Sequence, residues 1–520
     1  MTRNGRCKFA KYVGLTIVLA TFLIAGAQLG WAAGSNPTRL IFAQGTDATT
    51  LDPASIDGSP TAIVCMMLYD TLVKYDKNLN IVPDLATSWS ISDDALTMTF
   101  HLRKDVKFQD GTPFNADAVV FNINRLLDPN TRVPLRNYIS FVKSAKVIDE
   151  YTVEFTLKYP HAPALARLTA PNNSMVSPTA VKKYGKDFGT HPVGTGSFNL
   201  VEWVKDDHIL LAKNENYWGK VPAIDELMIR IIPEDESRVL ALESGQVDFT
   251  VRVPPMDVPR LKGEGLNVSV VPSTRAIYIG MNNQYKMLKD PRVRQSLNYA
   301  VNKEAIVEVL LQGYAHVMDS PLTPQYFAYK AVGPYEYNPA KAKQLLAEAG
   351  YPKGFTITLM TPHGRYLMDY RVAEAIQGYL AKVGITVKIK EMEWATYLSL
   401  VRKPVNENPT QLFLLGWGPW ILDPDQMLRP MFSSSEWAPN GSNYTFYKND
   451  RVDELLQVGT SIVDPQKREV AYGQAQEIIW EDAPWIFLYN EQQIVAMDPK
   501  VTGVNVLPFE LLDFSNAKKD

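Results

Sequence analysis

Residues 355–389 have the sequence FTITLMTPHGRYLMDYRVAEAIQGYLAKVGITVKI, which carries the clearest architectural pattern in the chain. Apolar residues alternate with threonines over residues 355–359, which is typical of a β-strand. Apolar residues then recur at helical spacing from Val372 to Leu380, and Gly384 ends the helical pattern. Alternation returns over residues 385–389. Strand, helix and strand in this order predict a right-handed βαβ unit with two parallel strands.

The predicted unit has helical and strand neighbours in sequence. Asn338-Pro339 is typical of a helix start, and Gly350 of the end of that helix. Downstream, Leu412–Leu415 form a short apolar run that predicts a buried strand, which stops where Gly416–Pro419 must turn the chain. We expect this strand to belong to the same α/β domain as the βαβ unit.

The loop after this strand places Trp417, Trp420, Asp423 and Asp425 close together. In open α/β sheets, the loops that leave the carboxyl ends of strands form the ligand crevice. Aromatic faces beside carboxylates therefore indicate a binding site. The alternative is that both tryptophans anchor a core and both aspartates cap turns.

The other parts of the chain show a mixture of strand and helix patterns, with no internal repeat and no Gly/Ser linker. Interleaved domains are therefore expected rather than domains on tethers. Short apolar or alternating runs predict strands near residues 40–43, 96–102, 151–157, 198–203, 209–212, 227–231 and 485–489. Helical spacing and caps predict helices near residues 62–73, 115–127, 239–245, 291–301 and 464–480.

Residues 1–32 are expected to be a secretory signal peptide. Four basic residues precede the uncharged, largely apolar run Tyr12–Ala27, which is shorter than the ~20 residues of a comfortable membrane span. Small residues offer two cleavage points, and the one after Ala32 is preferred because polar sequence follows it. Cys7 precedes the apolar run, so we expect a free soluble secreted protein without a lipid anchor. Cys65 is then the only cysteine, and its apolar neighbours predict a buried, inert thiol.

Charge and motifs exclude several classes of function. The signal contains four of the 53 Lys and Arg residues and none of the 56 Asp and Glu residues, so the mature net charge is −7 with His neutral. Nucleic acid is therefore not an expected partner. The sequence has no Gly-x-Ser-x-Gly elbow, no His-Glu-x-x-His and no Walker loop, and its six histidines lack ligand spacing. No cofactor is expected.

Several motifs resemble those of one known family. Residues 100–119, FHLRKDVKFQDGTPFNADAV, are similar to the signature of the solute-binding proteins of peptide/nickel-type ABC importers, called extracellular solute-binding family 5. The resemblance covers essentially the whole mature chain. Further matches occur in the right order at Pro83–Trp89, Pro192–Phe198, Asn214–Trp218 and Leu345–Tyr351.

The resemblance implies a two-lobed periplasmic-binding-protein fold of the α/β class, type II, in its large form with an accessory third domain. Mixed sheets flanked by helices would enclose a ligand cleft between the lobes. Two strands near Ser273 and Trp485 would form the hinge. The implied parts are lobe I (35–69, 179–272 and 486–520), the accessory domain (70–178) and lobe II (273–485).

The resemblance also implies a function without covalent chemistry. The protein would be the periplasmic component of an ABC importer, a monomer that captures a peptide-like or modified small solute and delivers it to a membrane permease with its ATPase subunits. Two alternatives stay open. One is a secreted glycoside hydrolase that uses Asp423 and Asp425 with tryptophan platforms. The other is a metal-chelate binding protein of the same fold, although residues 364–520 contain no histidine.

Two positions depart from the peptide-binding relatives. The aspartate that accepts a peptide's α-amino group in those relatives is matched by Trp420, and an arginine that some of them use for the ligand carboxylate is matched by Leu414. A buried ammonium without an anion costs several kcal/mol. The departures therefore argue against an ordinary free-amino peptide in the usual pose, unless Asp423 accepts the ammonium.

The expected ligand is a modified peptide, an opine-like conjugate or an oligosaccharide. It is expected to stack on Trp394, Trp417 and Trp420, with Asp57, Gly58 and Ser59 on the opposite wall of the cleft. Arg275, near the hinge, is the candidate for an anionic group, with a structural salt bridge as the alternative. The full set of candidate ligand-binding residues is Asp57, Gly58, Ser59, Arg275, Trp394, Trp417, Gly418, Trp420 and Asp423.

Overall fold

The computed structural model describes residues 37–520, and Thr38–Asp520 form one compact unit. The signal peptide predicted at residues 1–32 lies outside the described residues. Among the described helices, none is both long enough and apolar enough to cross a membrane.

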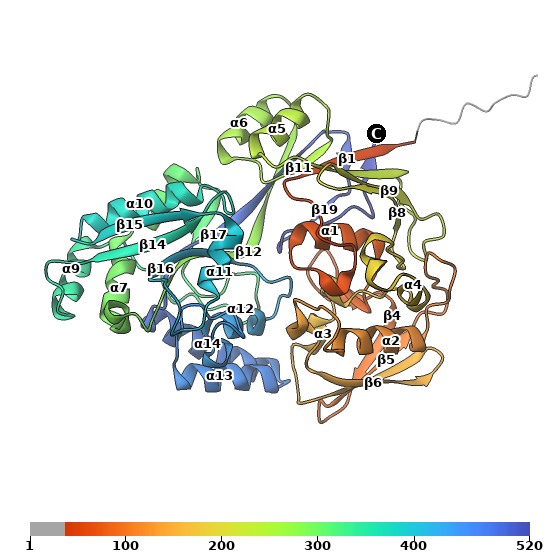
Figure 1. Cartoon of the computed structure of the whole chain (residues 1–520), viewed down its shortest axis with the longest axis horizontal. Coiled ribbons are helices and arrows are strands. Elements are labelled where there is room, and N and C mark those ends of the chain that lie inside the picture. Colours follow the sequence, from red (N-terminus) through yellow and green to blue (C-terminus); the bar gives the residue numbers. More distant parts are fainter. Residues whose placement is uncertain (1–36) are drawn as a thin grey trace, which may run out of the picture. The chain divides into compact units, whose positions relative to one another are not determined.

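An eleven-stranded mixed sheet runs through this unit (Figure 1). Ten strands follow the order β15-β14-β16-β12-β17-β11-β1-β10-β9-β8, and β13 pairs separately with β17. The strands are β1 (Arg39–Gln44), β8 (Phe198–Val204), β9 (His208–Lys213), β10 (Glu226–Ile231), β11 (Phe249–Val251), β12 (Asn267–Met281), β13 (Ala315–Val317), β14 (Thr356–Pro362), β15 (Thr386–Met392), β16 (Leu412–Trp417) and β17 (Trp485–Met497).

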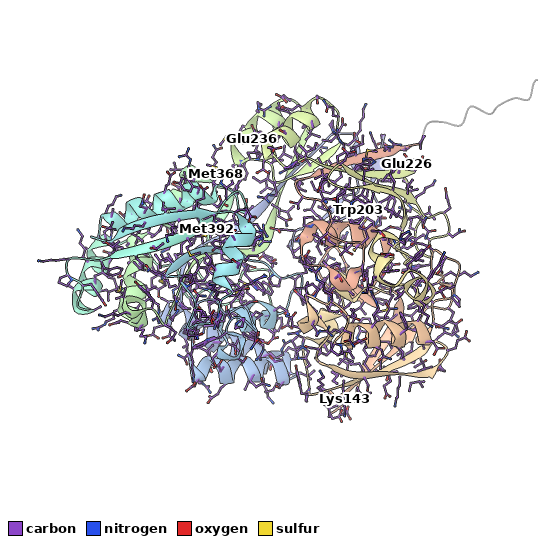
Figure 2. All side chains as sticks on the ribbon, in the orientation of Figure 1. Lys143, Trp203, Glu226, Glu236, Met368 and Met392 are labelled. Atoms are coloured by element: carbon purple, nitrogen blue, oxygen red, sulfur yellow. The ribbon has the colours of Figure 1, made fainter. Side chains whose placement is uncertain are left out.

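The predicted βαβ unit is confirmed. β14 and β15 pair in parallel, with Thr356 opposite Thr386, and α10 (Asp369–Ala381) packs against both strands. β16 also pairs in parallel with β14, which confirms that the strand before the tryptophan loop belongs to this domain. All three strands therefore end at one edge of the sheet, which Met368 and Met392 mark in Figure 2.

Two long strands connect the two halves of the sheet. β12 and β17 pair along almost their whole lengths, with a register break between Pro272 and Ala276. On one side of the break β17 also pairs with β11, and on the other side β12 pairs with β16. The passage of β12 lies close to the predicted hinge at Ser273. The passage of β17 lies at Asn490–Gln492, a few residues beyond the predicted position, because Trp485 still pairs with Gly280.

Most buried apolar residues form clusters that follow the proposed division, although Trp420 and Ile421 of lobe II join clusters of the other parts. Two clusters draw only on residues between Ala276 and Tyr489. A third lies between Leu72 and Met175, with Ala54 added, and surrounds a four-stranded antiparallel sheet of order β4-β5-β7-β6. The accessory domain that we propose at residues 70–178 thus has a core of its own. Its elements are β4 (Ala86–Ile91), β5 (Thr97–Leu102), α2 (Ala116–Leu127), β6 (Val142–Asp149), β7 (Thr152–Leu157) and α3 (Ala164–Arg167).

The helix predicted at residues 62–73 is shorter than expected. α1 ends at Leu68, and Val73 already begins a strand. Tyr69, Leu72 and Val73 are also buried, so buried apolar residues continue past the end of the helix and the pattern does not mark it. Cys65 lies on α1 and is fully buried, as predicted. Most of the other predicted helices and strands are found within a few residues of their predicted positions.

Further elements complete the unit. The helices are α4 (Pro178–Tyr184), α5 (Asp235–Glu243), α6 (Val258–Gly263), α7 (Pro291–Ala300), α8 (Lys303–Ala305), α9 (Pro339–Glu348), α11 (Trp394–Val401), α12 (Pro424–Phe432), α13 (Asp450–Ser461) and α14 (Pro465–Asp482). Short strand pairs are β2 (Val73–Tyr75) with β3 (Ile81–Pro83), β18 (Val501–Thr502) with β21 (Lys518–Lys519), and β19 (Asn505–Leu507) with β20 (Leu511–Asp513).

Gly354 allows a test of the close approach between the segments that precede β14 and β15. It has a φ of +70°, and a Cβ there would lie 2.0 Å from the Gly384 carbonyl oxygen. Gly354→Ala should therefore lower stability by roughly 2–4 kcal/mol, because backbone must move. Gly378→Ala in α10 meets no atom within 4 Å and is the control, with a gain of up to ~1 kcal/mol expected. Thermal and urea unfolding of the two variants measure the difference, and equal stabilities would contradict the close approach.

Candidate ligand-binding site

The carboxyl ends of the parallel strands bring three loops together. Tyr366 from the loop after β14 lies edge-on to Trp394, which begins α11 just after β15, with ring centroids 6.2 Å apart. The Tyr366 hydroxyl donates to the Gly416 carbonyl near the end of β16 at 3.3 Å. Trp394 also stacks on Tyr397 at 5.6 Å. The structure therefore places Trp394 at the same sheet edge as the tryptophan loop.

Trp417 and Gly418 anchor the start of that loop. The half-buried Trp417 indole donates through Nε1 to the Gln426 carbonyl at 3.1 Å. A Cβ at Gly418 would lie 3.1 Å from the Arg275 Cβ, so the loop runs close against β12. Only a small residue fits at this approach, which ties the loop to the strand that connects the two halves of the sheet.

Trp420 reaches across to α1. It is 7% exposed, and it packs in an apolar cluster whose other buried members come from residues 40–69, 176–249 and 495–517. Its Nε1 donates to Ser59 Oγ at 3.4 Å. Gly58 is the N-cap of α1, and the exposed Asp57 accepts a hydrogen bond from Thr49 Oγ1 at 3.1 Å. Trp420 and Ser59, predicted on opposite walls, are thus brought together.

The Asp423 carboxylate already has partners within the protein. It caps α12 by accepting from the Asp425 amide at 3.0 Å, and both of its carboxylate oxygens lie 2.8 Å from Arg468 Nη2. Burial raises the pKa of Asp423. The expectation that this carboxylate receives a ligand ammonium is corrected accordingly, because the buried Arg468 already neutralises it. The position of Asp423 agrees with the alternative prediction, in which this aspartate is a capping residue.

Asp425 is likewise engaged. Arg167 and Arg429 each lie 2.8 Å from it, and Thr460 donates to it. Burial opposes ionisation, but the two guanidinium groups hold the pKa of Asp425 below its usual range. A carboxylate of this kind is a poor proton donor at neutral pH. The pair of residues that suggested a glycoside hydrolase is therefore accounted for by ion pairs.

Arg275 forms the salt bridge that was its alternative role. Its Nε and Nη2 lie 2.6 and 2.5 Å from the two carboxylate oxygens of Glu510, and Glu491 lies 3.6 Å away. Although burial works in the opposite direction, Arg275 lowers the pKa of Glu510 to about 2. Arg275 is not a free receptor for an anion in this arrangement.

Sequence reasoning missed Arg365, a half-buried guanidinium of this region; the exposed Arg252 nearby also forms no ion pair within residues 37–520. Arg365 lies 4.9 Å from the Tyr366 ring centroid and 5.2 Å from that of Trp394, and it forms no ion pair with a carboxylate of residues 37–520. Burial lowers its pKa. Arg252 donates to the Arg365 carbonyl at 3.4 Å. The position of Arg365, three residues after a strand end, was the available signal.

These side chains form one charge cluster beside the passage of β12 and β17. Its members are Arg252, Arg275, Arg365, Glu491 and Glu510, which influence one another's ionisation. Three cations face two anions. The cluster therefore has one uncompensated positive charge, and it favours an anionic group at Arg365.

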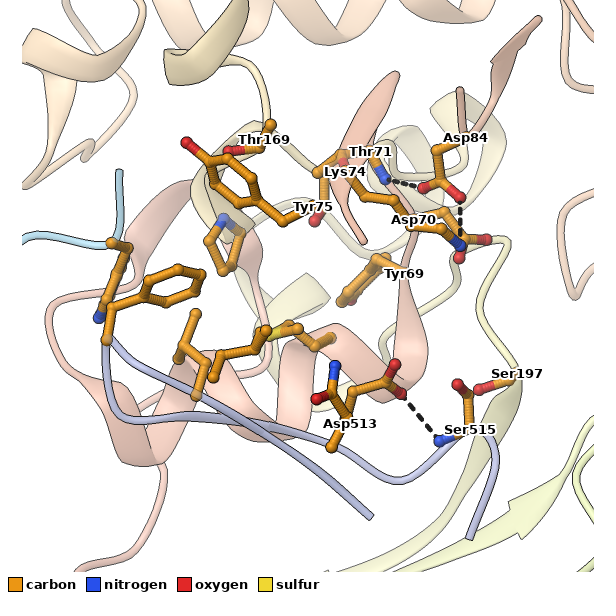
Figure 3. Close-up of a pocket in the computed structure, with 18 of the residues that line it drawn as sticks. Tyr69, Asp70, Thr71, Lys74, Tyr75, Asp84, Thr169, Ser197, Asp513 and Ser515 are labelled. Atoms are coloured by element: carbon orange, nitrogen blue, oxygen red, sulfur yellow. Dashed lines mark hydrogen bonds and ion pairs between the residues drawn. The ribbon is translucent and has the colours of Figure 1, made fainter. Parts of the chain in front are cut away.

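A second feature that the sequence did not indicate is a polar cavity of about 100 Å³ next to Trp420 (Figure 3). Asp70, Asp84, Asp513 and Lys74 line it. Lys74 lies 2.8 Å from Asp84, and burial together with Asp70 raises the pKa of Asp84 to about 7. Asp513 comes from a segment far in sequence from Asp70 and Asp84, so no local pattern predicts that it meets them.

The fold and the site define a class of protein. Two groups of strands joined by β12 and β17 meet at an aromatic, charged site, and the arrangement is that of a solute-binding protein. Residues 80–439 match the family described as bacterial extracellular solute-binding proteins, family 5 Middle, and the chain belongs to this family. It is the substrate-binding component of an ABC importer.

One named relative and two solved structures are similar to the chain over nearly its whole length. The glutathione-binding protein GsiB of Pectobacterium atrosepticum is 36% identical over 491 residues, which is 94% of each chain. The periplasmic binding protein DppA from Helicobacter pylori, solved with the peptide STSA, is 33% identical with a TM-score of 0.81 and covers 91% of this chain and 96% of its own. AgaA from A. tumefacien R10, solved with agropinic acid, is 28% identical with a TM-score of 0.79, covering 93% and 99%.

Asp423→Asn separates a structural role from a binding role. Asn caps helices as well as Asp does, so the change removes the ion pair with Arg468 and leaves the cap. We expect a loss of about 3–5 kcal/mol in stability, because Arg468 stays buried without its anion, and an unchanged solute Kd. Asp464→Asn, at the exposed N-cap of α14, is the control and should be nearly neutral. Unfolding and calorimetric binding measure both; lost binding with unchanged stability would restore Asp423 as a ligand residue.

Proposed function

We propose that this protein captures a small anionic, peptide-like solute in the periplasm, with glutathione as the first candidate, and delivers it to a membrane permease with ATPase subunits. Removal of residues 1–32 would release it without a lipid anchor. The similarity to glutathione-binding proteins along nearly the whole chain supports this ligand class.

The observation that carries the proposal is the unpaired Arg365. Glutathione has two carboxylates and one ammonium at neutral pH, so it brings a net negative charge to a cluster that lacks one. A carboxylate at Arg365 would form charge-assisted hydrogen bonds, each worth ~1.5–3 kcal/mol. The Tyr366 and Trp394 rings both lie close to this guanidinium and restrict its movement before the solute arrives.

The ammonium end of the solute would face Trp420. Cation–π contact with an indole contributes ~0.5–2 kcal/mol, which only partly replaces an ion pair. The carboxylates of the cavity beside Trp420 outnumber its single lysine and add attraction for a cation. The two ends of the site therefore differ in sign, and a solute with separated charges of both signs fits that difference.

Other solutes are weaker candidates. An opine fits the anionic end, and AgaA was solved with agropinic acid. A neutral oligosaccharide would leave Arg365 unpaired in a desolvated cleft, which is costly. In the described part of the chain, no group of three His, Cys, Asp or Glu side chains is placed to hold a metal ion, so a metal would enter only inside a chelate.

Arg365→Gln tests the anion subsite. Loss of the charge-assisted bond should weaken glutathione binding by about 10- to 100-fold, corresponding to ~1.5–3 kcal/mol. Arg371→Gln removes a solvent-exposed arginine from α10 and should leave affinity unchanged. Isothermal titration calorimetry with glutathione, an amidated glutathione and an agropine-type opine separates the ligand classes. Full affinity in the Arg365→Gln protein would contradict the assignment.

Trp420→Ala tests the aromatic wall. We expect affinity to fall at least tenfold, since the change removes the indole face and opens a gap against α1. Trp420→Phe keeps a ring but loses the bond to Ser59, so it should lose only the ~0.5–1.5 kcal/mol of a neutral hydrogen bond. Unchanged affinity in the alanine variant, measured by the same titration, would exclude the indole from the site.

A further inference from the structure

The proposed accessory domain and lobe II make direct contact at residues that are not part of the charge cluster. The Ala162 amide donates to the Thr460 carbonyl of α13 at 2.8 Å, and Arg167 of α3 lies 2.8 Å from Asp425 of α12. Both side chains of that ion pair are buried. In α12, Arg429 holds Asp425 from within the same helix. We call residues 161–167 with Asp425 and Thr460 the interlobe contact.

His161 lies buried inside the interlobe contact. It is 4% exposed, stacks on Phe141 at 4.7 Å and meets Tyr159 edge-on at 5.6 Å. Neither of its ring nitrogens has a hydrogen-bond partner. Buried polar groups are nearly always paired, so this imidazole has a specific reason to be there.

The charges that face His161 come from both sides of the contact. Arg167 lies on its own side, and Asp425, Arg429 and Arg468 face it from lobe II. With the Asp423 that pairs with Arg468, three cations and two anions lie around the ring, and Asp425 is already shared between two arginines. A positive imidazolium would therefore be repelled, and it would find no free acceptor in this contact.

We propose that the interlobe contact is a pH-sensitive latch, which holds the two lobes together while His161 is neutral and releases them when His161 is protonated. This inference rests on the proposed solute-binding function, in which the lobes close around a solute, but not on the identity of that solute. It gives the accessory domain a role in controlling closure.

The direction of the pH effect follows from the two states. Burial, and then Arg167, lowers the pKa of His161 to about 3 when the interlobe contact is made as in this structure. Once the lobes separate, the groups of lobe II withdraw and the ring meets water, so its pKa moves back toward ~6.5. Closure is then unaffected by His161 at pH 7.5, and it weakens as the pH falls below ~6.5. At pH 5.0 the closed-to-open ratio should be lower by up to about 30-fold.

A distance measurement in the ligand-free protein tests the latch. Spin labels on cysteines introduced at Lys143 and Glu469, both exposed, report the separation of the accessory domain from α14 by pulsed electron resonance. Cys65 is buried and does not compete for the label. We expect the short-distance population of the otherwise unmodified protein to fall between pH 7.5 and 5.0.

His161→Phe keeps a ring against Phe141 but cannot be protonated, so its distance distribution should not respond to pH. His161→Gln serves the same purpose if the phenylalanine variant does not fold. His363→Asn removes an exposed histidine and should keep the full response. An equal response in the His161 variants, or no response in the parent protein, overturns the latch.

Glutathione titrations at both pH values separate the two proposals. With the latch, its Kd at pH 5.0 should rise by up to about 30-fold in the parent and remain nearly constant in His161→Phe. If glutathione does not bind at either pH, the proposed ligand is contradicted, while the ligand-free distances still decide the latch.

Discussion

The pairing of β12 with β17 is the constraint on which the other features depend. These two strands belong to both halves of one sheet, and their register breaks only where they pass from one half to the other. Arg275 and Glu491 project from this passage, and Gly418 lies against it. Because the strands are continuous, any change of angle between the halves must move the charge cluster and the tryptophan loop together.

Most charged side chains of the site form ion pairs that stabilise the fold, and Arg365 remains available to bind a solute. Asp423, Asp425, Arg275 and Glu510 all satisfy one another or neighbouring arginines within the chain, at distances of 2.5–2.8 Å. Arg365 forms no ion pair with a carboxylate of residues 37–520, and two aromatic rings lie close to its guanidinium. A desolvated charge without a counterion is expensive to keep, so its presence points to a partner that arrives from outside.

Local patterns predicted most elements but not all of their limits. The βαβ unit followed from periodicity, because one face of each element is buried and the other is not. α1 was predicted too long because buried apolar residues continue past its end at Leu68 as far as Val73. The hinge near Trp485 was implied by the family resemblance, and β17 passes between the two halves of the sheet a few residues later. Among the site residues, the meeting of Trp420 with Ser59 was foreseen only as facing walls, through the family resemblance. The partners of Asp423 and Arg275 could not be foreseen, since they lie 45 and 235 residues away.

The sequence by itself determined the class of fold, the family and the position of the aromatic loop, because alternation, helical spacing, caps and family motifs are local properties of the chain. Only the tertiary structure decided which charged groups are free. Ion pairing depends on contacts between distant segments. Those contacts pair Asp423 with Arg468 and Arg275 with Glu510, whereas Arg365 has no anion and the His161 ring has no hydrogen bond within residues 37–520. The chemistry of the site therefore depends on long-range packing that no local pattern records.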